Sequence, residues 1–136
     1  MATITRTRLS PKARAWLEQP NFGFVATLVE DGSPHVSPVW IDTDGEHVLF
    51  NTAEGRIKAD NVRHDGRVAL SLSPSDNPYQ HLDIRGHVIE IVEGEEAEQH
   101  IHALHRKYHG GGRYPLRPGE RRLKVVIEPI AVKLSG

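Results

Sequence analysis

Six segments of the chain carry the apolar or alternating pattern that is typical of β-strands. The first three are separated by turns containing Asp31-Gly32 and Asp44-Gly45, so consecutive hairpins in a three-stranded meander are expected. Pro38 indicates an edge strand or a bulge, and Gly86 indicates a bulge or a close approach by a neighbouring strand. The predicted strands cover residues 22–29, 35–41, 47–51, 67–73, 79–92 and 123–134, the last of them interrupted at Pro129.

Helical periodicity replaces this pattern in a short N-terminal segment and in a longer one near the C-terminus. Ser10 followed by Pro11 is typical of a helix start, and the amphipathic stretch from Lys12 to Glu18 ends before Pro20. The longer segment, from Glu93 to His109, is followed by three glycines that end the helix. Its apolar stripe consists of Ala97, Ile101, Leu104 and Tyr108.

Strands joined mostly by hairpins, with two or three helices, predict a mainly β (α+β) protein. The expected architecture is a six-stranded antiparallel barrel with flanking helices, in a single domain over residues 1–136. A β-sandwich is the alternative, but a sandwich is not expected to contain a helix of this length.

Composition narrows the classes of partner. The chain has 17 Lys plus Arg against 18 Asp plus Glu, so it has no overall positive field to hold nucleic acid, and anion recognition must be local. There is no cysteine, which excludes disulfides, thiolate metal sites and a cysteine nucleophile. No apolar run approaches membrane-spanning length, and we expect a soluble cytoplasmic protein whose core a partner subunit completes.

The segment 51–61 is the strongest candidate for a binding site. An apolar strand ends there in a small-residue turn and enters a short helical segment, which presents free backbone N–H groups to an anion. Arg56 can grip a phosphate with two bonds, and Lys58 adds a compact positive charge. Because the two lie two residues apart, they reach one anion only if Arg56 belongs to the turn and Lys58 to the first helical turn. The alternative is a solvated helix with both charges in water.

Nine histidines raise the question of a metal site. His102, His105 and His109 fall on one helical face, with Glu98 one turn earlier, and imidazoles so placed could hold zinc. No HExxH motif accompanies them, and we favour a solvated or pH-sensitive helix face, with no metal. The charges of 120–122 and of Lys124 are most simply exposed.

Several short segments follow one another along the chain in a characteristic order. They are Ala26-Thr27-Leu28, Asp31 to His35, Arg56 to Asn61, Arg63 to Val68, Asn77-Pro78-Tyr79, Arg85-Gly86, Lys107-Tyr108, Tyr114-Pro115 and Glu120-Arg121-Arg122. In this order the chain resembles the split-barrel flavin and deazaflavin oxidoreductases, the superfamily of the pyridoxamine 5′-phosphate oxidase-like proteins. The later segments are most similar to its actinobacterial branch, which uses coenzyme F420. The resemblance runs from about Ser10 to Leu134.

The resemblance implies a homodimer with a six-stranded split barrel in each subunit and the cofactor in a groove between subunits. Arg56 and Lys58 match the cofactor-phosphate contacts, with Thr52 and Asn61 in support. The strand beside the ring is matched by Ser37, Val39 and Trp40. Tyr79 and Arg85 match positions that reach a cofactor from the partner subunit. Basic residues placed like those of 120–124 meet the acidic tail of the deazaflavin in some relatives.

The same resemblance implies hydride transfer between F420 and a small organic acceptor, with FMN as the second candidate cofactor. In such enzymes the protein binds, orients and excludes water, and no catalytic side chain is evident in this sequence. His81, Tyr79 or solvent remain open as proton donors. A non-enzymatic carrier or sensor of the cofactor is the rival reading. Oxidation of pyridoxamine phosphate would need a second phosphate cradle that the sequence does not show.

Overall fold

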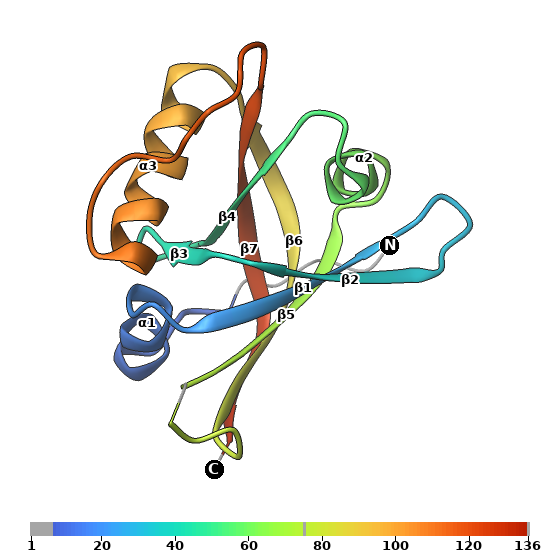
Figure 1. Ribbon diagram of the computed structural model, residues 1–136. Helices are drawn as coiled ribbons and strands as arrows, with labels where there is room; N and C mark the ends of the chain where they lie inside the picture. Colours follow the sequence, from blue (N-terminus) through green and yellow to red (C-terminus); the bar gives the residue numbers. More distant parts are fainter. Residues whose placement is uncertain (1–6, 75, 136) are drawn as a thin grey trace.

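The computed structural model describes residues 7–74 and 76–135, which form a mainly β structure with flanking helices, as expected (Figure 1). The helices are α1 (Pro11–Glu18), α2 (Ile57–His64) and α3 (Glu95–His109). The strands are β1 (Phe22–Leu28), β2 (Pro34–Val39), β3 (Ile41–Thr43), β4 (Val48–Ala53), β5 (Arg67–Ser73), β6 (His81–Val92) and β7 (Arg122–Ser135). No helix among these residues is long and apolar enough to cross a membrane.

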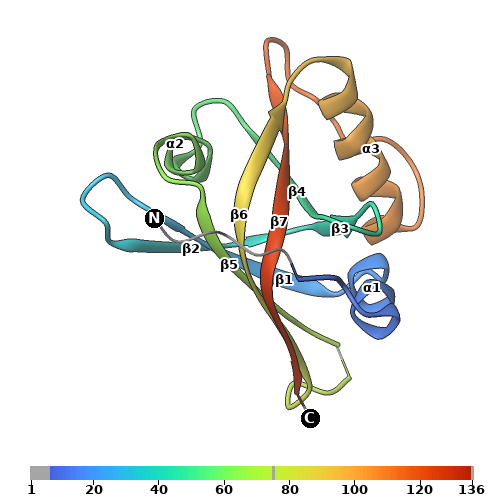
Figure 2. The same cartoon turned by 180° about the vertical axis from the view of Figure 1, so that it is seen from behind.

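All the strands belong to one antiparallel sheet with the order β2-β1-β5-β6-β7-β4-β3. Its two edge strands are consecutive in the chain, because only Trp40 lies between the end of β2 and the start of β3. The sheet therefore curls until its edges meet, and it forms the half-barrel seen in Figures 1 and 2. In both views α1 and α3 lie on one side of the β6–β7 pair and α2 lies on the other.

Two details of the predicted sheet are wrong. The strand expected over 35–41 breaks at Trp40, which makes seven strands instead of six. Both expected hairpins form, since β2 pairs with β1 and β3 pairs with β4, but they do not join in one meander because β2 and β3 lie at opposite edges of the sheet. Turn sequences determine where a chain reverses, but closure of the sheet brings β7 beside β4, and every residue of β4 is buried there.

Bulges in the long β6–β7 pair produce much of the curvature. One register shift falls between Arg85 and Gly86, which confirms the expectation for Gly86. A Cβ at Gly86 would lie 2.5 Å from a methyl carbon of Ile127 and 2.7 Å from the carbonyl oxygen of Glu128, so only glycine fits. Pro129 lies opposite Gly86 and does not end β7, which corrects the expected interruption.

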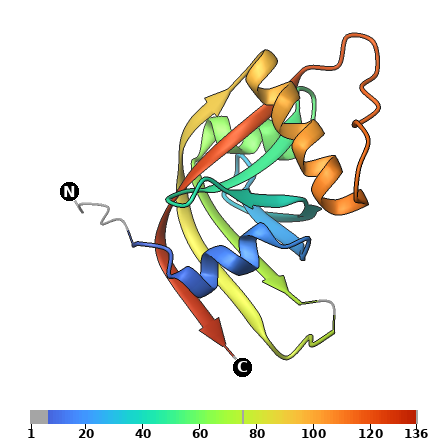
Figure 3. The same cartoon turned by 90° about the vertical axis from the view of Figure 1, so that its left-hand side faces the viewer.

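Both outer helices begin and end where their side chains permit. The Ser10 hydroxyl caps α1 by accepting a hydrogen bond from the Ala13 N–H at 3.1 Å, and α1 buries Ala13 and Leu17 against the sheet. Helix α3 begins after Gly94, two residues later than expected, and ends at Gly110, which has a left-handed φ of 80°. The chain then runs back along α3 to the start of β7 (Figures 1 and 3).

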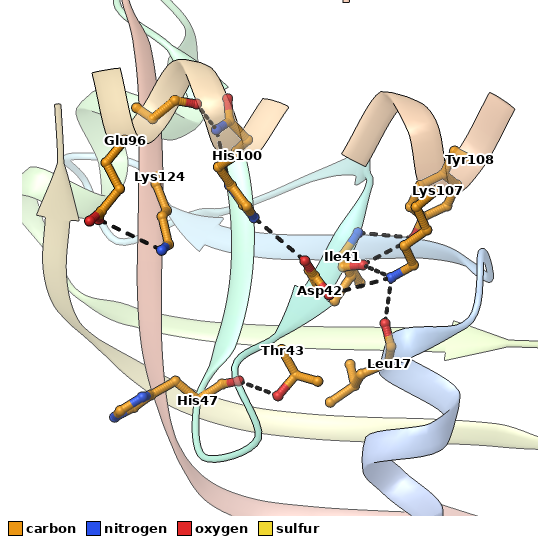
Figure 4. Close-up of polar contacts among 12 residues, drawn as sticks. Leu17, Ile41, Asp42, Thr43, His47, Glu96, His100, Lys107, Tyr108 and Lys124 are labelled. Carbon is orange, nitrogen blue, oxygen red and sulfur yellow. Dashed lines mark hydrogen bonds and ion pairs between the residues drawn. The ribbon is translucent and has the colours of Figure 1, made fainter. Parts of the chain in front are cut away.

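The C-terminal end of α3 is tied to the ends of α1, β1 and β3. The Tyr108 hydroxyl accepts from the Ile41 N–H at 3.0 Å and donates to the Asn21 carbonyl oxygen at 2.8 Å. The Lys107 ammonium donates to the carbonyl oxygens of Leu17 and Ile41 (Figure 4). These bonds hold α3 at a defined position beside β4, and the candidate site lies there.

Candidate functional site

The turn between β4 and α2 carries the two cations that the sequence singles out. Gly55 adopts a positive φ of 88°, Arg56 occupies the N-cap position of α2, and Lys58 is the second helical residue. Arg56 thus belongs to the turn and Lys58 to the first helical turn, which is the condition for both to reach one anion. Within the described part of the chain neither forms an ion pair.

A cavity of about 270 Å³ opens beside this turn and has two chemically different walls. One wall is polar and cationic, and consists of Arg56, Lys58, Arg122 and Asn51. The other is apolar or aromatic, and consists of Phe22, Pro38, Val39, Trp40, Ile101, Leu104 and Tyr114. Such a cavity suits a ligand with a flat apolar part and an anionic end.

Arg122 was not among the predicted phosphate contacts, although the resemblance implied that basic residues placed like those of 120–124 meet the acidic tail of the deazaflavin. It was expected to be exposed, but it is 6% exposed, because β7 begins at this residue and pairs it with Ala53 of β4. Its Nε donates to Asn51 Oδ1 at 2.8 Å, and its Nη1 donates to Glu120 Oε2 at 2.9 Å. The guanidinium lies 5.0 Å from the centre of the Tyr114 ring. The only local indication in the sequence that Arg122 belongs to the site was its place directly before a long apolar strand.

The electrostatics of the cavity favour an anion. Burial lowers the pKa of the Lys58 ammonium, and the neighbouring positive charges of Arg56 and Arg122 lower it further. Burial would raise the pKa of Glu120, but hydrogen bonds from the Arg117 N–H and from Arg122 outweigh it and lower that pKa. Glu120 pairs with Arg122 but does not line the cavity, whose lining includes the three cations Arg56, Lys58 and Arg122. A bound anion would relieve the repulsion among them.

Trp40 lies at the centre of an aromatic cluster beside the cavity. Its ring stacks on Tyr108 with centroids 5.4 Å apart and planes 13° apart. It meets His109 edge-on at 5.3 Å and Tyr114 edge-on at 6.3 Å. These contacts hold the indole in one orientation at the edge of the apolar wall.

The structure brings together only some of the residues that the resemblance implies. Four of them, Val39, Trp40, Arg56 and Lys58, line one cavity. The hydroxyls of Ser37 and Thr52 are buried, and within the described residues they have no hydrogen-bond partner. The remaining three lie elsewhere: Asn61 donates to Thr27 Oγ1 at 2.9 Å, Tyr79 is 86% exposed on a loop, and Arg85 is exposed on β6.

Neither side chain proposed as a proton donor lines the cavity. Tyr79 lies on the loop before β6, and His81 hydrogen-bonds Asp83 at 2.8 Å on β6 itself. The Tyr114 phenol does line the cavity, on the loop between α3 and β7, and the sequence reasoning did not single it out.

The three-histidine face of α3 is engaged by the loop that follows the helix. His102 is 5% exposed, so the expectation of a solvated face is wrong for this residue, and its Nδ1 accepts from the Tyr114 N–H at 3.1 Å. His105 Nδ1 lies 3.1 Å from the Gly111 carbonyl oxygen, and the His105 and His109 rings stack at 4.6 Å. Residues 7–74 and 76–135 contain no group of three possible ligands arranged for a metal ion.

Comparisons with known proteins identify the family and the fold of the chain. The family described as pyridoxamine 5′-phosphate oxidase matches residues 9–133. A solved F420 reductase is 32% identical with a TM-score of 0.78, and the match covers 88% of this chain and 94% of that one. No curated protein matches the chain.

Two more distant structures share the fold. A conserved hypothetical protein from Mycobacterium tuberculosis is 24% identical with a TM-score of 0.75, over 96% of this chain and 86% of that one. A candidate pyridoxamine 5′-phosphate oxidase from Listeria innocua is 21% identical with a TM-score of 0.67, over 90% of this chain and 94% of that one.

Proposed function

Because the chain belongs to the pyridoxamine 5′-phosphate oxidase family of split-barrel proteins, we propose that it is an oxidoreductase that binds a phosphorylated deazaflavin, F420. FMN is the alternative cofactor. The observation that carries the proposal is the single cavity with an apolar wall of Val39 and Trp40 and a cationic wall of Arg56, Lys58 and Arg122. The hydroxyl of Thr52, near the end of β4, has no partner among the described residues, but Thr52 does not line this cavity and its supporting contact stays a prediction.

Each wall has a defined task in this proposal. Arg56 supplies a planar fork and Lys58 a point charge for the phosphate, with the first turn of α2 behind them. Val39 and Trp40 give the ring a flat, water-excluding surface. When bound and reduced, the cofactor supplies a hydride to a small organic acceptor. The chain contributes binding, orientation and exclusion of water.

A homodimer completes the proposed groove. Phe22 and Phe24 lie on one exposed face of β1, and Val36 and Pro38 of β2 are paired opposite β1 residues on that same face. Phe22 and Pro38 also line the cavity, so the exposed apolar strip is continuous with it. A second copy covering this strip would close the groove and bring its own Tyr79 and Arg85 toward the cofactor.

F420 is favoured over FMN by two observations. The F420 reductase is the relative with 32% identity over most of both chains. In addition, a second cavity of about 380 Å³ shares Arg56 and Tyr114 with the first and is also lined by Arg117. Its two carboxylates, Glu54 and Glu120, are paired with Arg63 and Arg122. An acidic tail longer than the FMN phosphate would extend into this second cavity.

Titration of the purified protein with FMN and with F420 tests the proposal. Arg56→Ala and Lys58→Ala should each weaken binding of both cofactors about tenfold or more, because each removes a charge-assisted contact with the phosphate. Arg117→Ala should weaken F420 and leave FMN unchanged. Arg67→Ala is the control, since Arg67 pairs with Asp65 and lines neither cavity. Unchanged affinity in both Arg56→Ala and Lys58→Ala would contradict the proposed phosphate-binding site.

A cofactor carrier is the second candidate function. The described residues that line the cavity include no carboxylate and no histidine, so an acid or base for the acceptor is limited to Tyr114, Lys58 or solvent. An enzyme oxidises reduced F420 faster when unsaturated or carbonyl-containing acceptors are added. If a panel of such acceptors leaves the oxidation rate unchanged, the carrier function is favoured.

A further inference from the structure

The side-chain amide of Asn51, on β4, uses both its oxygen and its amino group in hydrogen bonds. Its Oδ1 accepts from Arg122 Nε at 2.8 Å. Its Nδ2 lies 3.0 Å from the Ala97 carbonyl oxygen and 3.1 Å from His100 Nδ1, both on α3. Asn51, His100 and Arg122 are all buried, so these bonds form in an environment with little competing water.

Hydrogen-bond chemistry determines the orientation of each group in this chain. Arg122 Nε can only donate, so the Asn51 oxygen must face it, and the Ala97 carbonyl can only accept, so the Asn51 amino group must face α3. The second Asn51 N–H then points at His100 Nδ1, which must accept. His100 therefore carries its proton on Nε2.

The Nε2 side of His100 faces Asp42 of β3. Nε2 lies 3.9 Å from Asp42 Oδ2, and the Lys107 ammonium lies 3.8 Å from Asp42 Oδ1 (Figure 4). Burial, together with the positive charges of Lys124, Lys107 and Arg122, lowers the pKa of His100 to about 4. Neutral His100 is consequently the form present at neutral pH, as the acceptor role of Nδ1 requires.

The guanidinium of Arg122 retains donor capacity that the described residues do not use. Nε is used by Asn51 and Nη1 by Glu120, while Nη2 donates to no acceptor among the described residues. Because Arg122 lines the same cavity as Arg56 and Lys58, this free edge is available to an anion held there.

We infer that Arg122 is a third anion-binding residue of the cavity, and that the buried Asn51–His100 pair positions its guanidinium from behind. The inference rests on the proposed function, since the anion is the cofactor phosphate. His100 acts through Asn51 and does not touch the ligand. Asn51 of β4, which lies 49 residues from His100 and 71 residues from Arg122, thereby couples α3 to β7.

FMN is the probe, titrated against the whole chain at neutral pH. Arg122→Met should weaken FMN binding about tenfold, because it keeps the side-chain bulk and removes the donors. His100→Leu should weaken it severalfold, whereas His100→Asn should restore most of the affinity, since an Asn oxygen can accept from Asn51 where Nδ1 did. In the Arg122→Met background, His100→Leu should cause no further loss, because a positioning residue has nothing left to position.

A second measurement does not depend on the ligand. Long-range ¹H–¹⁵N NMR of the free protein should show His100 protonated at Nε2 only, and Asn51→Leu should abolish this single-tautomer signature. Circular dichroism confirms that each variant is folded; if Asn51→Leu is not, the His100 series and the wild-type tautomer carry the test.

The outcomes separate this inference from the proposed function. One contrary outcome is that Arg56→Ala weakens FMN binding but Arg122→Met does not. Another is that His100→Leu weakens FMN binding equally with and without Arg122. Either result overturns the positioning role and leaves the proposed phosphate-binding site of Arg56 and Lys58 intact. A proton on Nδ1 would also overturn the positioning role. If neither Arg56→Ala nor Arg122→Met changes the affinity, both proposals fail.

Discussion

Individual side chains in this protein differ sharply in how far their roles follow from residue type. Arg56 and Lys58 stand out in the sequence because a strand, a small-residue turn and a helix start surround them, and the structure places them in one cavity. Arg122 and His100 give no such signal, since an Arg in a charged run and a His on a helix are both common at surfaces. Both are buried, and both owe their roles to neighbours distant in sequence.

At this scale, acid should destabilise the protein through His100. Its folded pKa of about 4 lies below the unfolded value of 6.5, so the unfolded chain binds the extra proton between these pH values. The free energy of unfolding that His100 contributes above pH 6.5 should be lost as the pH falls to 4. The total loss from this one group is about 3 kcal/mol. Urea unfolding at several pH values measures the loss.

His100→Asn is the comparison for that measurement, because an amide does not titrate. The variant should show a shallower decline of unfolding free energy between pH 6.5 and 4. An equally steep decline in both proteins would assign the acid sensitivity to other groups.

At the scale of elements, α3 depends on its last turn for its position. Tyr108 was predicted to pack as part of the apolar stripe of α3, and its aromatic contact with Trp40 agrees with that prediction. The hydroxyl adds bonds to β3 and to the start of β1 that no periodicity could indicate, because they join residues 67 and 87 positions apart. Burial raises the pKa of Tyr108, so the phenol stays protonated and able to donate.

Tyr108→Phe should lower the free energy of unfolding by about 1–3 kcal/mol, because it leaves the Ile41 N–H and the Asn21 carbonyl oxygen without this partner. Denaturant unfolding measures the change. Tyr79→Phe is the matched control, since Tyr79 is 86% exposed and should change stability little. Equal effects of the two substitutions would contradict the anchoring role of Tyr108.

On the scale of the whole molecule, the half-barrel leaves an apolar strip of β1 and β2 open beside the cavity. A single copy offers a cavity of about 270 Å³, near the lower limit for sites that enclose small molecules. The proposed dimerisation through this strip would account for both features, and the family resemblance implies a homodimer with the cofactor in a groove between subunits.

Phe24→Glu should convert the proposed dimer to a monomer and weaken cofactor binding, because it places a charge in the strip without touching the cavity lining. Light scattering after size exclusion measures the mass. Ile89→Glu is the control, since Ile89 is similarly exposed, at 49% against 52% for Phe24, but lies on β6. A dimer that persists in Phe24→Glu, or a monomeric parent protein, would contradict this interface.

The sequence by itself determined the element types, most of their ends and the turn for which we propose phosphate binding, because capping, turn chemistry and hydrophobic periodicity act over a few residues. Only the tertiary structure decided that β2 and β3 close the sheet through Trp40, that β7 lies beside β4, and that Arg122 joins Arg56 and Lys58. Strand order depends on which faces the closed sheet buries, and residues more than 60 positions apart share a site only once that closure has occurred.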